Sequence, residues 1–209
     1  MVEVLPAILE KDFDEIKKKS EQLLGIVKLA QLDISDGTFV PEETWQDDEQ
    51  LSELGNELKF DLHLMVDKPE QWIEKWSQDN IFRITFHFSA TYDILRTINI
   101  IKQAKKEVGV ALNLETPVDS VYDILKEIDL VLIMGITPGA QGRVFDAKAI
   151  DKIKELREHD QNIKIGVDGG VSAIVSSSII EAGANMLVSG SYLFGEDNIK
   201  KAIKSLQKE

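Results

Sequence analysis

The sequence predicts a (β/α)8 barrel, an α/β fold in which eight parallel strands alternate with helices. Eight apolar segments rich in β-branched residues recur along the 209 residues, at spacings of about 20 to 35 residues. Their near-continuous hydrophobicity is typical of parallel strands that are buried on both faces. Amphipathic segments with helix signals lie between them, and this alternation is the pattern of a barrel built from βα units.

The expected strands follow one another along the whole chain. They cover residues 4–9, 27–35, 58–66, 82–88, 108–114, 129–136, 163–169 and 185–191. The alternative is a doubly wound open sheet, which usually has fewer strands and a GxGxxG fingerprint after the first of them. The segment PAILEKDF at 6–13 contains no such fingerprint, so the barrel is favoured.

Helix signals mark the connections between the strands. In the segment 12–25, Asp12 predicts an N-cap, Glu15 follows three residues later, and Gly25 predicts the end. In the segment 68–76, Pro69 lies near the first turn, where its missing N–H costs nothing. The other expected helical segments are 90–107, 120–128, 146–159, 172–184 and 196–209, with a weaker one at 50–57.

Composition limits the classes of protein that the chain can belong to. With no linker, low-complexity segment or composition break, residues 1–209 are expected to form one barrel domain. No apolar run approaches the roughly 20 residues of a membrane span, and the first residues lack the pattern of a signal peptide. The absence of cysteine excludes disulfides and cysteine nucleophiles, and a cytoplasmic location is expected. The formal net charge of −13 argues against nucleic acid as a partner.

Polar residues on four expected strands share one face. Side chains alternate along a strand, so in the second strand Gln31 and Asp33 point away from Leu32. The polar residues lie towards the ends of their strands, so this face is expected to look into the barrel near its C-terminal mouth, where barrel active sites lie. By the same alternation, one residue set on each strand shares this face. The set is Gln31, Asp33 and Ser35 in the second strand, Asp61, His63 and Met65 in the third, Thr85 and His87 in the fourth, and Gly166 and Asp168 in the seventh.

Asp33, His63 and Asp168 are the candidate catalytic and metal-binding set. An unpaired buried carboxylate costs several kcal/mol, so three strands that each bury such a group predict a shared partner. These oxygen and nitrogen ligands suit one divalent metal ion such as Zn²⁺, Mn²⁺ or Fe²⁺. Two carboxylates beside a metal suit proton removal next to a carbonyl, with one Asp taking a proton and the other returning one. A Schiff-base aldolase is disfavoured, because Lys164 lies at the start of its strand.

Two further polar residues have structural readings. His87 by itself is interpreted as a satisfied core or rim histidine rather than a ligand. Asp36 precedes Gly37 in a turn, where a local cap or Asx-turn explains it.

Glycine-rich loops predict a phosphate site. Barrel phosphate sites form after the seventh and eighth strands, from backbone N–H groups and a helix N-terminus. Here these segments are VDGGVS and VSGSYLFG, and the loop after the sixth strand, TPGAQGRVF, adds two glycines. Amide cradles of this kind would bind an anion despite the acidic surface. The residues involved are Gly139, Gly142, Gly169, Gly170, Gly190 and Ser191.

Together these stretches resemble the ribulose-phosphate 3-epimerase family over nearly the whole chain. The matching pieces are PAIL, LDISDGTFVP, FDLHLMVDKPEQW, TFHFSA, LIMGITPGAQGRVF, VDGGV and EAGANMLVSGS. The resemblance implies a TIM barrel of the ribulose-phosphate-binding type that interconverts D-ribulose 5-phosphate and D-xylulose 5-phosphate by inverting C3. It also implies a small-molecule sugar phosphate as the ligand and a homo-oligomer, while the composition predicts no membrane or nucleic-acid partner.

The resemblance also implies roles for individual residues. Asp33 and Asp168 become the acid/base pair and metal ligands, His63 becomes a third ligand that also contacts substrate, and Gln31 stands at the position of a fourth ligand. The implied substrate-binding residues are His63, Met65, Met134, Gly139, Ala140, Gln141, Gly142, Gly169, Gly170, Gly190 and Ser191.

The chain departs from the family pattern at four places. Gln31 replaces the first metal histidine, Ala7 replaces the serine of PSIL, and Ser35 replaces a methionine. PGAQGR stands for PGFGGQ. A glutamine carbonyl can bind a metal, but more weakly than imidazole does.

These departures leave three hypotheses open. The first is a metal-assisted ketopentose-phosphate 3-epimerase. The second is an epimerase of another ketose phosphate, such as a ketohexose 6-phosphate, because Ala7, Ser35 and Ala140 alter the pocket. The third is a non-catalytic barrel that keeps phosphate binding and has lost its metal.

Overall fold

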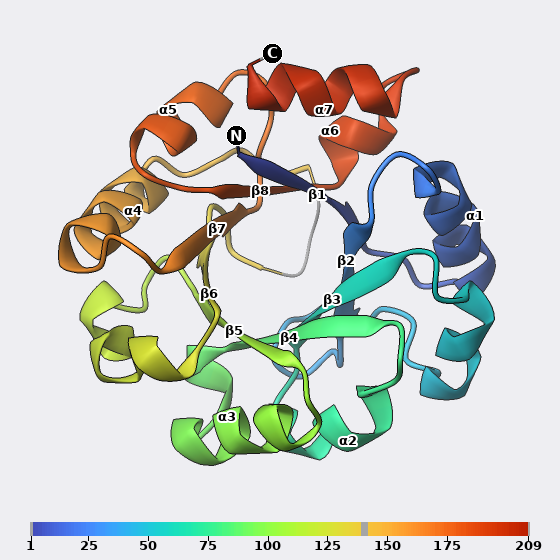
Figure 1. The fold of residues 1–209 in the computed structure, drawn as a ribbon, viewed down its shortest axis with the longest axis horizontal. Coiled ribbons are helices and arrows are strands. Elements are labelled where there is room, and N and C mark those ends of the chain that lie inside the picture. Colours follow the sequence, from blue (N-terminus) through green and yellow to red (C-terminus); the bar gives the residue numbers. More distant parts are fainter. Residues whose placement is uncertain (1, 139–141, 209) are drawn as a thin grey trace.

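Eight parallel strands close into a barrel in the computed structural model, which describes residues 2–138 and 142–208. Each strand pairs with the next along the chain, and β8 pairs with β1, with the helices around the outside (Figure 1). The strands are β1 (Glu3–Ile8), β2 (Leu29–Ser35), β3 (Lys59–Met65), β4 (Ile81–His87), β5 (Glu107–Leu112), β6 (Leu130–Met134), β7 (Lys164–Asp168) and β8 (Met186–Ser189). The predicted fold class is therefore confirmed.

Helices and 3₁₀ turns connect the strands on the outside of the barrel. The α-helices are α1 (Phe13–Leu23), α2 (Ile73–Trp76), α3 (Ile94–Gln103), α4 (Lys148–His159), α5 (Ser176–Glu181), α6 (Ser191–Phe194) and α7 (Ile199–Gln207). The 3₁₀ helices are η1 (Asp48–Leu54), η2 (Pro69–Gln71), η3 (Phe88–Ala90) and η4 (Val118–Glu127).

The first helix begins at the residue that the sequence predicts. The side chain of Asp12 accepts hydrogen bonds from the backbone N–H groups of Asp14 and Glu15, at 2.8 and 3.4 Å. This satisfies two of the N–H groups that have no partner within the helix. Glu15 pairs with Lys18 instead of completing a capping box, and Gly25 follows the helix with a φ of +71°.

Several segments differ from the predicted helices and strands. The weaker helical segment expected at 50–57 is the 3₁₀ helix η1. Residues 118–127 form a 3₁₀ helix rather than an α-helix, and their Val, Ser and Asp residues are poor α-helix formers. The segment around Pro69 divides into η2 and the short α2. The eighth strand ends at Ser189, before the point the sequence predicts, because Gly190 leaves the extended conformation and α6 begins at Ser191.

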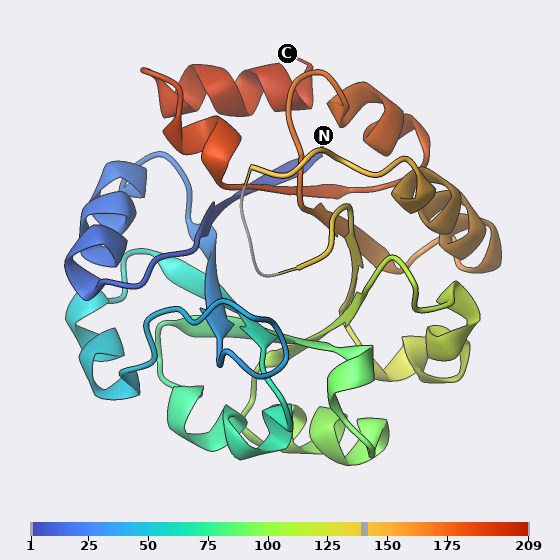
Figure 2. The same ribbon diagram turned by 180° about the vertical axis from the view of Figure 1, so that it is seen from behind.

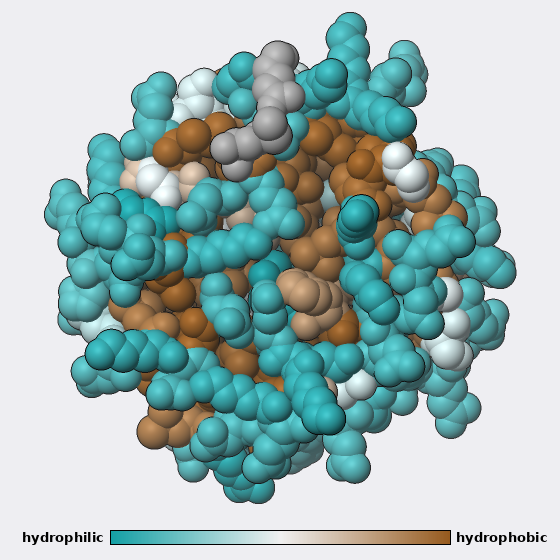
Figure 3. All heavy atoms as spheres, viewed as in Figure 1, coloured by the Kyte–Doolittle hydropathy of each residue, from teal (hydrophilic) through white to brown (hydrophobic). Residues whose placement is uncertain are grey.

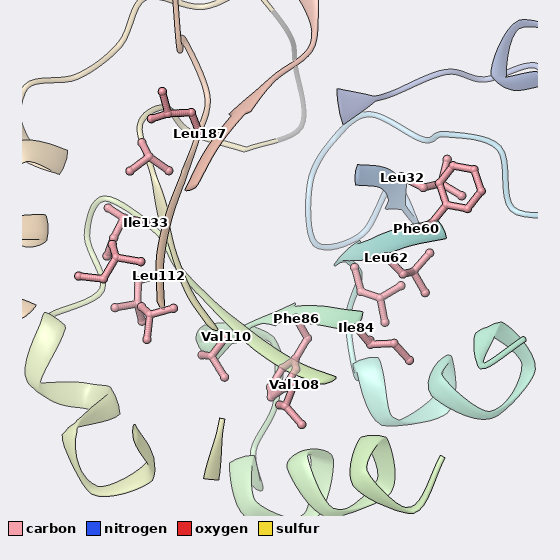
Figure 4. Packing of buried hydrophobic residues seen from close by; sticks show 14 of the residues in the cluster. Leu32, Phe60, Leu62, Ile84, Phe86, Val108, Val110, Leu112, Ile133 and Leu187 are labelled. Carbon is pink, nitrogen blue, oxygen red and sulfur yellow. The ribbon is translucent and has the colours of Figure 1, made fainter. Parts of the chain in front are cut away.

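The hydrophobic core has two parts. The larger part lies between the barrel and the helices, where alternate strand residues such as Leu62, Phe86 and Val110 point outwards (Figure 4). The smaller part lies inside the barrel and includes Leu132, Met134, Met186 and Val188. Because the outward residues anchor the helices, the remaining strand positions are free to point into the barrel.

A buried ion pair fills the barrel interior on the N-terminal side of the site. Arg83 donates from Nε to Asp61 Oδ2 at 2.8 Å and from Nη1 to Glu107 Oε2 at 3.1 Å. Thr85 donates to the other carboxylate oxygen of Asp61, also at 2.8 Å. The side chains of Arg83 and Asp61 are fully buried. A buried ion pair satisfied in this way supports the structure as long as both partners are present.

Charged and polar side chains cover much of the molecular surface. Figure 3 shows one end of the barrel, where hydrophilic side chains surround smaller hydrophobic patches. Figure 2 views the other end, where the chain after β2, drawn in blue, lies across part of the opening. Within residues 2–138 and 142–208, none of the helices has the length and apolar character needed to cross a bilayer.

Candidate active site

Asp33, His63 and Asp168 come together inside the barrel. Asp33 and His63 are register partners on β2 and β3, and His63 Nδ1 lies 2.8 Å from Asp33 Oδ1. Asp168 is the last residue of β7, and its Oδ2 lies 3.6 Å from the same His63 nitrogen. One ligand atom from each of the three residues lies within 4.8 Å of the other two. The convergence that the sequence pattern indicates is therefore present in the fold.

Gln31 lies beneath this group, two residues before Asp33 on the same face of β2. Its Nε2 donates hydrogen bonds to Asp33 Oδ1 at 2.8 Å and to Asp168 Oδ2 at 2.7 Å. The same nitrogen is 3.3 Å from His63 Nδ1. One carboxamide thus connects two carboxylates that belong to strands separated by β1 and β8.

His63 lies between a carboxylate and a second imidazole. Its Nδ1 faces Asp33, and its Nε2 is 3.0 Å from Nε2 of the buried His87. Since two bare imidazole nitrogens cannot hydrogen-bond, one of the two Nε2 atoms carries a proton. The ring of His87 also lies against Phe39, with ring centroids 4.8 Å apart. His87 thus contacts the site through His63, which the reading of His87 as a lone core histidine does not predict.

The end of β2 is fixed by the chain that follows it. The hydroxyl of Thr44 donates to the carbonyl of Asp33 at 3.1 Å and accepts from the N–H of Ser35 at 2.9 Å. Gln46 donates to the carbonyl of Ser35 at 2.9 Å. These bonds hold the backbone that presents the Asp33 carboxylate.

Asp36 holds the turn that follows β2. One carboxylate oxygen accepts from the N–H groups of Thr38 and Phe39, at 2.8 and 2.9 Å. The other oxygen accepts from the N–H of Asp67 at 2.7 Å. This is the local Asx-type role predicted from the Asp-Gly sequence, with an added contact to the chain after β3.

Burial and neighbouring charges shift the pKa values of the site residues. Burial, followed by the charge of Asp33, raises the pKa of Asp168 to about 7. Burial lowers the pKa of His63, but the hydrogen bond and charge of Asp33 outweigh it, and the pKa is raised overall. Burial, followed by the charge of His63, lowers the pKa of His87 well below its ordinary value. Asp168 can therefore exist as acid or base near neutral pH, while His87 stays neutral.

The cavity above these residues contains most of the predicted site. Asp33, His63 and Asp168 line it from three strands. The predicted substrate-binding residues Met65, Met134, Gly142, Gly169, Gly170, Gly190 and Ser191 line it as well. Gly139, Ala140 and Gln141 lie outside the described residues. The sequence pattern did not single out Leu9, Ile136, Pro138, Val171, Val188 and Ser189, which also line the cavity and have no chemical signature of their own.

One end of the cavity is made of backbone. Gly169 and Gly170 have φ values of +101° and +69°, which side chains other than glycine rarely adopt. A Cβ added to Gly170 would lie 2.6 Å from the backbone nitrogen of Phe145. The two loops after β6 and β7 therefore pack backbone against backbone. Ser191, the first residue of α6, lines the same cavity.

Ala7 and Ser35, two of the four departures from the family pattern, differ in whether they line the cavity. Ala7 lines the cavity, so its missing hydroxyl changes the wall of the site. Ser35 is fully buried and donates to the carbonyl of Glu42 at 2.9 Å, outside the set of lining residues. The prediction that Ser35 alters the pocket is therefore not supported by its position.

The donor set at the centre of the site fits a divalent transition metal. Two carboxylate oxygens and one imidazole nitrogen are the ligands that such ions accept, and they lie close enough together to share one. The fold and the site thus define an enzyme of the barrel class with two carboxylates and an imidazole grouped towards the carboxyl ends of its strands. The sequence profile of the ribulose-phosphate 3 epimerase family matches residues 3–194. The chain belongs to this family, whose members are isomerases of the epimerase class.

Curated relatives match the chain over almost its whole length. The ribulose-phosphate 3-epimerase of Bacillus subtilis (strain 168) is 34% identical, and the match covers 99% of each chain. The enzyme of the same name from Methanocaldococcus jannaschii is also 34% identical, with 99% of this chain and 90% of the relative covered. The chloroplastic ribulose-5-phosphate-3-epimerase of Arabidopsis thaliana is 35% identical, with 98% and 75% covered.

Solved structures of other enzymes share the fold. A tryptophan synthase α-subunit from Pyrococcus furiosus superposes with a TM-score of 0.72 at 14% identity, covering 100% of this chain and 98% of the other. A 3-hexulose-6-phosphate synthase superposes with a TM-score of 0.65 at 16% identity, covering 100% and 99%. At these identities the likeness is one of fold alone.

Proposed function

We propose that the protein inverts C3 of D-ribulose 5-phosphate to give D-xylulose 5-phosphate, by proton transfer between two carboxylates. The observation that supports this most is the convergence of Asp33, His63 and Asp168 in one cavity. Glycine backbone, including that of Gly169 and Gly170, lines the same cavity. We propose that the carbon next to the carbonyl lies at the carboxylates and that the phosphate group of the same small sugar lies at the glycines.

Asp33 and Asp168 are the proposed acid/base pair. They come from β2 and β7, so they can approach a bound sugar from different sides. One carboxylate takes the C3 proton and leaves an enediolate, and the other carboxylic acid returns a proton to the opposite face. With its pKa raised to about 7, Asp168 can act as acid or base at neutral pH.

One divalent metal ion is proposed to bind to Asp33, His63 and Asp168. When bound, such an ion supplies positive charge that stabilises the oxygens of the enediolate. His63 is placed by its contact with His87, so its Nδ1 stays directed at the carboxylates. Met65 and Met134 line the walls beside the carboxylates and exclude water from the reacting carbon.

The phosphate is proposed to bind to the loops after β6, β7 and β8. Gly142, Gly169, Gly170, Gly190 and Ser191 line that part of the cavity. Backbone N–H groups and one hydroxyl can neutralise an anion there without a cationic side chain. Gly139, Ala140 and Gln141 remain part of this proposal on the family resemblance alone.

Isotope exchange with a metal panel tests the reaction. The protein is stripped of metal with a chelator and incubated with ribulose 5-phosphate in D₂O, with and without Zn²⁺, Mn²⁺ or Fe²⁺. We expect deuterium at C3 and formation of xylulose 5-phosphate, followed by NMR. Absence of both with every metal would refute the proposal and leave a phosphate-binding barrel without catalysis.

A second candidate substrate is a ketohexose 6-phosphate. Ala7 supports it, because a methyl group lines the cavity where the family pattern has a hydroxymethyl group. Comparing kcat/KM for the pentose and hexose phosphates decides between the two, and Ala7→Ser is expected to shift the preference towards the pentose. We also propose, from the family resemblance, that the protein is a homo-oligomer, which light scattering tests.

A further inference from the structure

The carboxamide of Gln31 lies between the atoms proposed to hold the metal. Its Nε2 is within 2.7–3.3 Å of one atom from each of Asp33, His63 and Asp168. The side chain is fully buried, so it cannot move aside into solvent. A cation bound to all three residues would need the space into which the amide hydrogens of Gln31 point.

The orientation of the amide follows from the charges around it. If Gln31 turned its Oε1 towards Asp33 and Asp168, the partial negative charge of the amide oxygen would face acceptor oxygens of both carboxyl groups. With Nε2 in this position, each of its two hydrogens has a carboxylate acceptor. Hydrogen bonds to charged acceptors are stronger than those between neutral groups.

The oxygen of the same amide is left in an unfavourable position. Within the part of the chain that the structure describes, the buried Oε1 of Gln31 has no hydrogen-bond partner. Leaving a buried acceptor unpaired is unfavourable. In this orientation the acceptor Oε1 is unpaired among the described residues, and both N–H donors of Nε2 face the carboxylates. The neutral amide thus occupies the position in which a cation would contact the same two carboxylates.

We infer that Gln31 is an internal substitute for the metal ion. In the metal-free protein it holds Asp33 and Asp168 together, and it must release both carboxylates before a cation can bind to them. This inference rests on the metal site in the proposed function. It makes Gln31 a competitor of the metal, whereas a histidine at this position could only add a ligand.

The first test measures stability without metal. Gln31→Met keeps the length of the side chain and removes both donors. In EDTA at pH 8, we expect this variant to unfold about 5 °C or more below the wild type, because two carboxylates lose their shared donor. With saturating Zn²⁺ the difference shrinks. Gln78→Met is the matched control, because Gln78 donates to the carbonyl of Asp48 outside the site, and its effect is the same with and without Zn²⁺.

The second test measures Zn²⁺ affinity by competition with a chelating dye. Gln31→Met is expected to bind Zn²⁺ as tightly as the wild type or more tightly, and Gln31→His at least 10-fold more tightly. A Gln31→Met variant that binds Zn²⁺ 10-fold more weakly would overturn the inference, because Gln31 would then be an ordinary oxygen ligand. Equal unfolding temperatures of wild type and Gln31→Met in EDTA would overturn it as well.

A third measurement follows the side chain of Gln31 in the wild-type protein. The side-chain NH₂ signals of Gln31 are identified in a ¹⁵N spectrum by their absence from Gln31→Met. In the metal-free protein we expect both protons to exchange slowly with solvent, and Zn²⁺ to abolish this protection. Protection that persists at saturating Zn²⁺ would contradict the inference. None of these measurements uses a sugar phosphate, so a failure of the proposed reaction would appear only in the isotope-exchange assay.

Discussion

Asp33 and His63 lie directly opposite each other on adjacent parallel strands, with 2.8 Å between Asp33 Oδ1 and His63 Nδ1. Parallel register fixes this pair. On β4 the register partner of His63 is Thr85, and His87, two residues further on, contacts the other nitrogen of His63. The histidine can therefore neither turn nor exchange its two nitrogens without breaking a buried contact. Asp168 completes the group from β7, across two intervening strands.

If each carboxylate transfers a proton at one face of C3, a variant that lacks one carboxylate should still exchange a proton but should no longer epimerise the sugar. We expect Asp33→Asn and Asp168→Asn each to lower kcat for interconversion about 10²- to 10⁴-fold. Each variant should still exchange the C3 proton of one epimer with D₂O, and the epimer should differ between the two variants. NMR of deuterium incorporation into both substrates measures this.

The control is the metal content of the two variants at saturating Zn²⁺. If both bind the ion and neither exchanges either epimer, the assignment of one carboxylate to each face is wrong. If both exchange the same epimer, only one of the two residues acts as a base in the way proposed.

The raised pKa of Asp168 predicts a pH-dependent stability of the metal-free protein. Its pKa is about 7 in the folded state against 3.8 ordinarily, so between these values the folded protein binds more protons than the unfolded chain. The contribution of Asp168 is therefore fully present below pH 4 and is lost as the pH rises through 7. The loss is a few kcal/mol at most.

Denaturant unfolding of the wild type and Asp168→Asn in EDTA, from pH 4.5 to pH 8, measures this effect. The stability of the wild type relative to the variant should fall as the pH rises, since asparagine does not titrate. A constant difference over this range would mean that the pKa of Asp168 is not raised in the folded protein.

The fold was predictable from the sequence because a barrel strand is buried on both faces. That burial gives eight near-continuous apolar segments, and each overlaps one of the observed strands. The family and the isomerase class, inferred from the resemblance, are confirmed. Strand parity alone placed Asp33, His63 and Asp168 inside the barrel, and the structure shows them together. That residues 1–209 form one domain, and the individual roles of the site residues, stay predictions.

Other features depend on contacts between strands, which the alternation of side chains along one strand does not predict. The sequence placed Gln31 on the inner face, but the two acceptors of its Nε2 depend on how β2 and β7 meet across the barrel. Arg83 points inwards at a level where Asp61 and Glu107 surround it, and this pairing needs the register of three strands. The 3₁₀ form of η4 was missed because its apolar spacing also fits an α-helix.

Gly170 is predicted to be irreplaceable for binding the phosphate end of the substrate. In Gly170→Ala the new Cβ would meet the backbone nitrogen and Cα of Phe145, at 2.6 and 2.8 Å, so the loop after β6 must move. A displacement of about 1 Å in a positioning loop can cost about 100-fold in kcat/KM. We expect most of this loss to appear as a higher KM, and we expect inorganic phosphate to bind more weakly.

Gly25→Ala is the matched control for this variant. Gly25 has a φ of +71°, close to the +69° of Gly170, but a Cβ at Gly25 meets no atom within 4 Å. Both substitutions therefore carry similar backbone strain, and only one displaces a neighbouring loop. If the two variants showed the same kcat/KM, the loops after β6 and β7 would not form the phosphate site.

The ion pair beneath the site should contribute to stability without contributing to specificity. Asp61→Asn removes the fully buried carboxylate that pairs with the guanidinium of Arg83 and leaves the ion pair with Glu107. Loss of a buried partner costs about 3–5 kcal/mol. Replacing both members, as Asp61→Leu with Arg83→Met, removes the unpaired charge and should be less destabilising than Asp61→Asn alone. Urea unfolding of the wild type, Asp61→Leu, Arg83→Met and the double variant gives the coupling energy. If the losses in free energy of unfolding were additive, Arg83 and Asp61 would not depend on each other. Apolar packing would then be what stabilises this half of the barrel.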